Sequence, residues 1–194
     1  MIKSIDFYFD FISPYSYLAL KKINSFNRSN SLNINYKPIL LGGLHKLGGI
    51  TAPAFNDRKL KNMKNDCELV ALKNNIKFQW NSKFPINTLN LMRGYLVLED
   101  KIKKKYFEIC FDAYWKNNID ISNNENIIEI LNLCQIDHNK FFEDIKTQKI
   151  KDELKQLTSL AFKNDIFGAP TFVVNNKIFW GQDRLEYALD ECSS

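Results

Sequence analysis

The chain has 194 residues, of which 45% are hydrophobic and 25% charged, and its formal net charge at pH 7 is +5. That length supports one sizeable core, while no apolar run approaches the roughly 18 residues that a membrane span needs. The lysines are spread along the chain rather than clustered, which indicates solvated helix faces and not a nucleic-acid or membrane surface.

The N-terminal part predicts a strand, a helix and a second strand. Residues 4–11, SIDFYFDF, alternate and are rich in aromatic rings, which is typical of a β-strand. Ser13 then suits an N-cap and Pro14 the first helical position, so a helix is predicted through YSYLALKKINSFN. Residues 32–40, LNINYKPIL, alternate again. Because the first strand contains acidic residues, it is no signal peptide, and a cytoplasmic protein is expected.

The middle of the chain predicts only helices. Residues 42–53, GGLHKLGGITAP, are predicted to form a glycine-rich loop. The following stretch has apolar residues with a period near 3.6 and no strand signal. Helices are expected over residues 56–75, 87–101, 103–117, 123–134, 138–147 and 150–164.

Strand character returns near the C-terminus. Residues 170–181, PTFVVNNKIFWG, predict two short strands, and Asn175-Asn176 between them is typical of a two-residue hairpin turn. The next residues, QDRLEYALDE, predict a closing helix.

This order of elements predicts an α/β protein. A β-α-β unit at one end and a β-β-α unit at the other is the thioredoxin arrangement. We therefore expect a thioredoxin-like domain made of residues 1–41 and 165–194, with residues 42–164 as an inserted all-helical domain. Two separate folds are less favoured because neither half alone could bury its sheet.

The start of the first helix reads Ser13-Pro14-Tyr15-Ser16, where cysteines at both ends would make a thiol–disulfide site. No pair of cysteines elsewhere has redox or zinc spacing, and only two histidines could join them, so no metal site is expected. We expect all four cysteines to be reduced and buried: Cys67, Cys110, Cys134 and Cys192.

A second feature, FGAPTF at residues 167–172, is expected to meet Ser13 in space. In thioredoxin-like folds a proline before the third strand is usually cis and faces the active-site helix. Ala169 would then have a free N–H and C=O, which could pair with an extended peptide. A helix N-terminus favours thiolates, and Ser13 could donate to one brought by a ligand such as glutathione. Taken alone, Ser13 before a proline is only a good helix start.

Nearly the whole chain resembles the 2-hydroxychromene-2-carboxylate isomerases, relatives of kappa-class glutathione transferases, through FYFDFISPYSYLA, FPINTLNLMRGYL and FGAPTFVVNNKIFWGQDRLE in the same order. The resemblance implies a homodimer that uses glutathione. Ser13 would position its sulfur, and Ala169 beside Pro170 would hold the cysteinyl backbone. Gln182 and Asp183 would hold the γ-glutamyl end, although both are equally suited to capping the last helix.

The substrate side is less sharply defined. Asn87 would cap a helix, and Arg93 would hold a substrate carboxylate or, equally, form a surface salt bridge. Lys46 or His45 could line the pocket, with a solvated loop position as the alternative. Where members of the family often carry an asparagine in the glycine-rich loop, this chain has Ile50.

Three functions remain open. The first is a glutathione-dependent isomerase in which a thiolate adds to a conjugated substrate, the ring opens, a bond rotates and the thiol leaves. The second is a kappa-like transferase acting on small aromatic or other electrophiles. The third is a non-catalytic module that binds peptides. A thiol–disulfide oxidoreductase is disfavoured because Ser13 and Ser16 lack sulfur. Trp180 is expected in the core or in a pocket wall.

Overall fold

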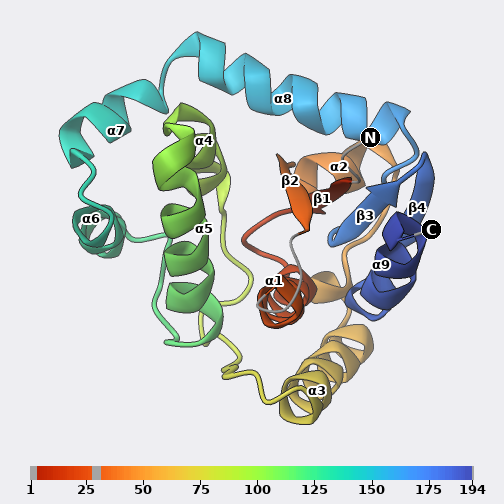
Figure 1. Ribbon diagram of the computed structural model, residues 1–194. Coiled ribbons are helices and arrows are strands. Elements are labelled where there is room, and N and C mark those ends of the chain that lie inside the picture. The colour runs from red at the N-terminus through yellow and green to blue at the C-terminus, as the bar shows by residue number, and fades with distance from the viewer. Residues whose placement is uncertain (1–3, 28–31, 194) are drawn as a thin grey trace.

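The computed structural model describes residues 4–27 and 32–193, so residues 1–3, 28–31 and 194 of the predicted thioredoxin-like domain lie outside it (Figure 1). The strands are β1 (Ser4–Phe9), β2 (Asn33–Pro38), β3 (Thr171–Val174) and β4 (Lys177–Trp180). The helices are α1 (Pro14–Asn27), α2 (Leu41–Leu47), α3 (Asp57–Lys73), α4 (Leu89–Val97), α5 (Asp100–Trp115), α6 (Asn124–Leu133), α7 (His138–Asp144), α8 (Gln148–Lys163) and α9 (Leu185–Ser193), with 3₁₀ turns η1 (Pro53–Phe55) and η2 (Gln182–Arg184). None of these helices combines the length and apolar character that a membrane crossing requires.

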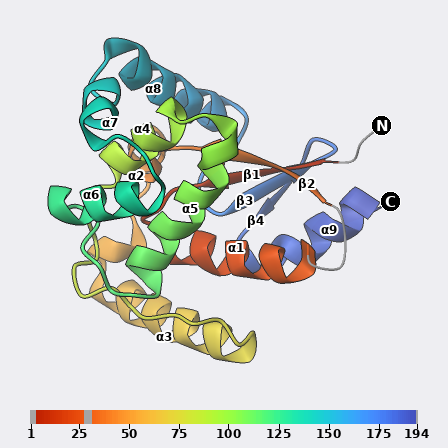
Figure 2. The ribbon, with the colours of Figure 1, turned by 60° about the vertical axis from the view of Figure 1, so that its left-hand side comes forward.

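The four strands form one sheet in the order β2-β1-β3-β4. β1 pairs parallel with β2 and antiparallel with β3, and β4 is antiparallel to β3. Helices α1 and α9 lie on one face of this sheet and α8 on the other (Figure 2). Phe7 and Phe9 of β1 are therefore fully buried on one face of the sheet, while Tyr8 is partly buried on the other. This is the predicted thioredoxin-like arrangement, and the predicted α/β class is confirmed.

The predicted hairpin turn and the capped start of α3 are confirmed. Asn175 and Asn176 both have positive φ, 49° and 63°, as a tight turn between right-twisted strands requires. α3 begins after Asn56, whose side chain accepts a hydrogen bond from the Lys59 N–H at 3.0 Å. Capping by a short polar side chain thus fixes this helix start.

The predicted loop at residues 42–53 is wrong, because its first half forms α2 and its end forms η1. Leu44 of α2 is fully buried. A Cβ on Gly43, also in α2, would lie 3.6 Å from the Thr158 side chain of α8. The Thr158 hydroxyl also accepts a hydrogen bond from the Leu40 N–H at 3.0 Å, directly before α2. This packing against α8 overrides the poor helix propensity of the glycines.

The break between the fourth and fifth helices also falls earlier than predicted. Leu98 and Glu99 are extended, with ψ of 149° and 147°, and α5 starts at Asp100. The Glu99 carbonyl accepts the first helical hydrogen bonds of α5, from Ile102 and Lys103. An acidic residue in this first turn suits the positive end of the helix.

One buried cluster of apolar side chains joins the sheet to the helical segment. The ring of Phe9 in β1 lies 4.6 Å from that of Phe107 in α5, and Phe11 lies 4.9 Å from Phe111. The Trp115 indole donates a hydrogen bond to the Phe11 carbonyl at 2.9 Å. The domain boundaries at 41/42 and 164/165 stay a prediction, since the core is continuous across them.

Candidate functional site

Ser13 lies at the junction between β1 and α1 and is 3% exposed. Its hydroxyl oxygen accepts a hydrogen bond from the Ser16 N–H at 3.1 Å, as an N-cap does. The hydroxyl itself donates to the Ala169 carbonyl at 2.8 Å. The Ser13 N–H donates to the Asp10 carbonyl at 3.0 Å. Ser13 is thus held between the turn that follows β1 and a segment 156 residues further along the chain.

The segment facing Ser13 ends at Ala169-Pro170, and this peptide bond is cis, as expected. No described residue accepts a hydrogen bond from the Ala169 N–H. The expectation that the Ala169 carbonyl is also free was wrong, because this carbonyl accepts a hydrogen bond from the Ser13 hydroxyl. The Gly181 N–H donates to the Pro170 carbonyl at 3.0 Å, so the contact between the two arms of the β3–β4 hairpin extends to Gly181, directly before Gln182.

A cavity of about 510 Å³ opens at this junction. Its wall is mainly apolar and comes from the start of α1, the α2–α3 region, residues 84–88 and residues 167–169. Apolar side chains in this wall include Ile12, Met63, Phe84, Phe167 and Trp180. The Phe167 and Trp180 rings contact each other with centroids 4.9 Å apart. A cavity with this lining suits a flat or hydrophobic ligand with few polar groups.

Few charged or titratable groups line the cavity. Asp10 is 1% exposed, and burial raises the pKa of its carboxyl group although several hydrogen bonds lower it. His45 of α2 is half-buried, and burial lowers the pKa of its imidazole, so the ring is neutral at pH 7. Lys59, in the first turn of α3, is the lysine that lines the cavity among the described residues.

The structure separates the predicted substrate residues into two groups. Asn87 lines the cavity, and its side chain accepts a hydrogen bond from the Leu89 N–H at 2.9 Å, whereas the N-cap position of α4 is Thr88 and not Asn87 as expected. Ile50 also lines the cavity. Lys46 is exposed and does not line it, because on α2 it is His45 that turns toward the cavity. Arg93 lies on α4 and does not line the cavity, and its Nε is buried without a hydrogen-bond partner within residues 4–27 and 32–193.

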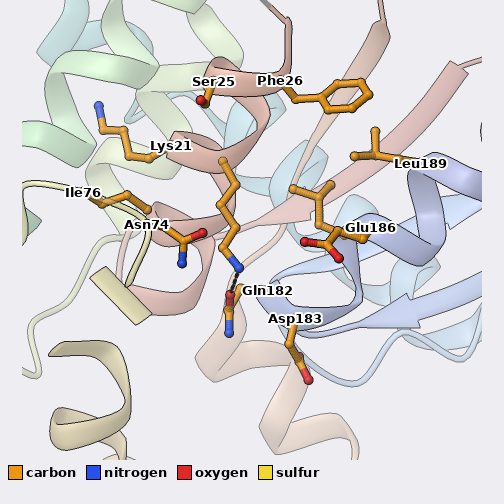
Figure 3. A pocket seen from close by; sticks show the side chains of 11 residues that line it. Lys21, Ser25, Phe26, Asn74, Ile76, Gln182, Asp183, Glu186 and Leu189 are labelled. Carbon is orange, nitrogen blue, oxygen red and sulfur yellow. Dashed lines mark hydrogen bonds between the residues drawn. The ribbon is translucent and has the colours of Figure 1, made fainter. Parts of the chain in front are cut away.

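Gln182 and Asp183 border a second, smaller cavity of about 270 Å³ between α1 and η2. The buried Gln182 carboxamide oxygen accepts a hydrogen bond from Lys22 at 2.5 Å, with Asp183 and Glu186 nearby (Figure 3). Burial lowers the pKa of Lys22, while the two carboxylates raise it. Lys21 lines the other side of this cavity. Positively and negatively charged side chains therefore both line the cavity where the family resemblance implies a γ-glutamyl group.

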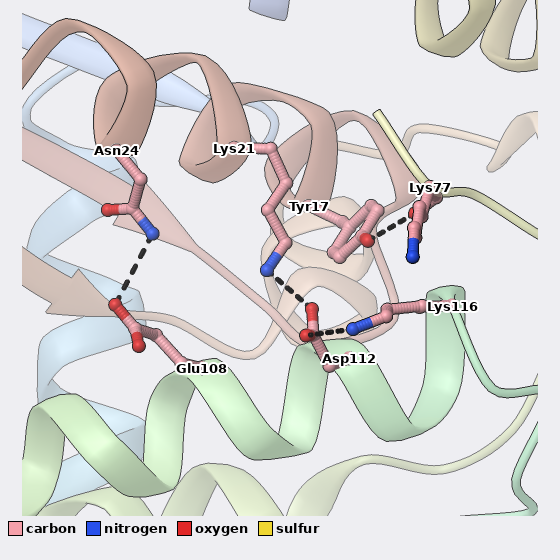
Figure 4. Close-up of polar contacts among 7 residues, drawn as sticks. All are labelled: Tyr17, Lys21, Asn24, Lys77, Glu108, Asp112 and Lys116. Atoms are coloured by element: carbon pink, nitrogen blue, oxygen red, sulfur yellow. Dashed lines mark hydrogen bonds and ion pairs between the residues drawn. The ribbon is translucent and has the colours of Figure 1, made fainter. Parts of the chain in front are cut away.

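Polar contacts fix the opposite side of α1 against α5 (Figure 4). Asp112 of α5 pairs with Lys21 of α1 at 2.5 Å and with Lys116 at 3.2 Å. The Tyr17 hydroxyl donates to the Lys77 carbonyl at 2.5 Å. These contacts hold the helix whose first residues carry Ser13.

The sequence reasoning missed Asp10, Thr88 and Lys59. The signal for Asp10 was a carboxylate within an otherwise apolar run, three residues before Ser13. The Thr88 hydroxyl donates to Asp10 at 2.6 Å across 78 residues, a contact that no local pattern announces. Lys59 follows its N-cap by three residues, but only the fold shows that it faces the cavity.

The fold matches those of known proteins. A family model described as a DSBA-like thioredoxin domain matches residues 4–192. The chain belongs to the DSBA-like thioredoxin domain family. Within that family it lacks the paired thiols: Ser13 and Ser16 occupy both ends of the motif, and the four cysteines are free and buried.

Two kinds of enzyme are among the relatives, as the sequence resemblance indicated. A 2-hydroxychromene-2-carboxylate isomerase from Sphingobium xenophagum is 29% identical over 189 residues, which are 96% of either chain. Glutathione S-transferase kappa 1 from Homo sapiens is 23% identical over 199 residues, covering 95% of this chain and 88% of the relative. A solved 2-hydroxychromene-2-carboxylate isomerase superposes with a TM-score of 0.89 at 22% identity, over 97% of this chain and 94% of that one, and thus has the same fold.

The Trp180 indole, which lines the cavity, packs closely against Gly168. A Cβ on Gly168 would lie 2.5 Å from the Trp180 indole nitrogen, so Gly168→Ala should displace the indole and weaken binding of an aromatic ligand about tenfold. Tryptophan emission and ligand titration measure the two effects. Gly42→Ala is the matched control, because Gly42 lines the same cavity and its Cβ would meet nothing within 4 Å. Equal effects of both substitutions would contradict this role of Gly168.

Proposed function

We propose that this protein is a glutathione-dependent isomerase of small aromatic carboxylates, resembling 2-hydroxychromene-2-carboxylate isomerase. The observation that carries the proposal is the Ser13 hydroxyl, held at a helix N-terminus opposite the Ala169 backbone and at the edge of an apolar cavity. A site of this kind stabilises a thiolate but cannot form a disulfide.

The residues fit an extended peptide. The Ala169 N–H has no acceptor among the described residues, so a peptide carbonyl can bind there as in β-strand addition. Gln182 and Asp183 come directly after Gly181, whose N–H donates to the Pro170 carbonyl at the end of the hairpin pairing. The cavity beside them holds Lys22 and Glu186 and therefore offers partners for both the carboxylate and the ammonium of a γ-glutamyl group.

Each residue then has a defined task. When bound, glutathione would supply a thiolate that adds to the conjugated substrate and later leaves. Ser13 donates a hydrogen bond to the sulfur, and the first N–H groups of α1 favour its negative charge. Lys59 attracts an anionic group of the ligand, while Phe84 and Trp180 enclose the ring and exclude water. Ile50 adds apolar surface at the position where the family resemblance implied an asparagine.

Titration with glutathione by calorimetry, together with thiolate absorbance, tests the shared assumption. Binding with a thiolate signal supports a thiol-activating enzyme. Turnover of 2-hydroxychromene-2-carboxylate then identifies the isomerase, whereas conjugation of general electrophiles without isomerisation identifies the kappa-like transferase. Absence of binding and of turnover overturns both and leaves the peptide-binding module.

Lys59→Met should weaken binding of the anionic ligand about tenfold, because a charge-assisted contact at the cavity is lost. The matched control is Lys46→Met, which removes the same charge from a residue outside the cavity. Calorimetry at two salt concentrations measures the effect. A similar loss in both variants would mean that only the net charge matters and that Lys59 makes no specific contact.

The homodimer implied by the resemblance is part of the same proposal. Sedimentation equilibrium over a range of protein concentrations measures it. A mass that stays at one chain would remove the dimer but leave the site unaffected, because every residue proposed here for the site belongs to one chain.

A further inference from the structure

Asp10 joins three segments that form the cavity wall. One carboxylate oxygen accepts hydrogen bonds from the Ile12 N–H at 3.2 Å and from the Thr88 hydroxyl at 2.6 Å. The other accepts from the Leu41 N–H at 2.8 Å. The Asp10 carbonyl also accepts from Ser13. One residue thus ties together the turn after β1, the start of α2 and the segment before α4.

The carboxyl group is buried, and the one cation among the described residues that line the cavity does not contact it. Lys59 of α3 lines the same cavity, as does the neutral His45 of α2, but neither forms a hydrogen bond or ion pair with Asp10. Tyr15 of α1 also lines it and is uncharged, since burial raises the pKa of its hydroxyl. Burial raises the pKa of the Asp10 carboxyl group, whereas the hydrogen bonds from Thr88, Leu41 and Ile12 favour its charged form. None of these donors carries a charge that would cancel that of the ionised carboxylate.

A carboxylate at this place would disfavour the ionisation of a thiol bound at Ser13. Both residues line the same cavity, and the helix N-terminus and the carboxylate have opposite effects on a thiol. The unpaired N–H groups favour the thiolate, whereas a nearby like charge disfavours it. A thiolate that forms too readily is a weaker nucleophile, and the best attacking thiol has a pKa near the ambient pH.

We propose that Asp10 is a positioning residue that holds the three walls of the site together and, through its negative charge, limits the ionisation of a thiol at Ser13. The importance of Asp10 for catalysis rests on the proposed function. The effect of the Asp10 charge on a thiol at Ser13 does not, because it can be measured without glutathione.

The test introduces a thiol at the site itself. In Ser13→Cys, thiolate absorbance and alkylation rate against pH give the ionisation midpoint of the new thiol. Burial raises the pKa of Cys67, Cys110 and Cys134, and Cys192 is also buried, so the native thiols interfere little. Adding Asp10→Asn should lower the midpoint by about one pH unit.

Asp6→Asn in the same background is the matched control. Asp6 lies on β1, four residues before Asp10, but pairs with Lys37 at 3.5 Å and does not line the cavity, so its removal should leave the midpoint unchanged. An unchanged or raised midpoint with Asp10→Asn would overturn the proposal. So would equal shifts in both variants, which would mean that only net charge matters.

A second measurement covers the case in which Asp10→Asn does not fold. In Ser13→Cys alone, the carboxyl carbon resonance of Asp10 should show a step at the thiol midpoint, since interacting groups titrate together. No step would overturn the proposal. A third outcome separates the two proposals. If the unmodified protein does not bind glutathione but Asp10→Asn still lowers the midpoint of the introduced thiol, the proposed function is wrong and the role of Asp10 remains.

Discussion

Ser13→Ala should lower isomerase activity by about 10²- to 10³-fold, while glutathione binding weakens by less than tenfold. The reason is that the hydroxyl acts on the sulfur, whereas the peptide backbone of the ligand is held by Ala169 and its neighbours. The substitution also removes the N-cap bond to Ser16 and the bond to Ala169, at a cost of about 1 kcal/mol in unfolding free energy. Turnover, calorimetry and thiolate absorbance on the same samples separate these effects.

Ser16→Ala is the matched control for this experiment. It deletes the same hydroxyl in the same turn of α1, but the Ser16 oxygen is buried and has no hydrogen-bond partner among the residues that the structure describes. We therefore expect activity and thiolate absorbance close to those of the unmodified protein. If Ser13→Ala kept its thiolate signal, the N-terminus of α1 alone would stabilise the sulfur and Ser13 would be only a helix cap.

Gly94→Ala should destabilise the protein by about 1–3 kcal/mol, because it overpacks the contact between helices. A Cβ on Gly94 would lie 2.3 Å from the Phe141 ring and 2.6 Å from the Tyr106 hydroxyl. Both neighbours are buried, and Tyr106 is held by a hydrogen bond to the Leu91 carbonyl at 3.0 Å. Denaturant unfolding measures the change as a shift of the midpoint at constant slope.

Gly43→Ala provides the comparison, since it is also a helical glycine. Its Cβ would make ordinary contacts, the nearest at 3.6 Å, so better helix propensity should leave stability unchanged or slightly higher. If Gly94→Ala were as stable as Gly43→Ala, the helices would adjust to the methyl group, and the close approach at Gly94 would not be needed for stability.

Local patterns predicted most of this fold, because apolar residues alternate in its strands and recur with a period near 3.6 in its helices. β1, the Asn175-Asn176 turn and the capped helices follow from residues within a few positions of each other. α2 was missed because its stability comes from α8, more than a hundred residues away.

The same distinction holds for the site. Ser13 and Ala169 belong to short motifs, and the structure brings them within hydrogen-bond distance. Asp10 gains its role from Thr88 and Leu41, and Lys59 gains its role from the position of α3 beside the cavity. Residues whose function depends on distant partners leave little trace in one sequence.

The single proton of the Ser13 hydroxyl has a consequence for which thiols the site accepts. That proton is already bonded to the Ala169 carbonyl. A simple alkyl thiolate that took it would leave the carbonyl without a donor, which costs about as much as the new bond returns. A cysteinyl ligand carries an N–H next to its sulfur and can give the carbonyl a replacement. Under the proposed function, the site therefore selects peptide thiols over equally acidic small thiols, through the neighbour of the sulfur and not through the sulfur itself.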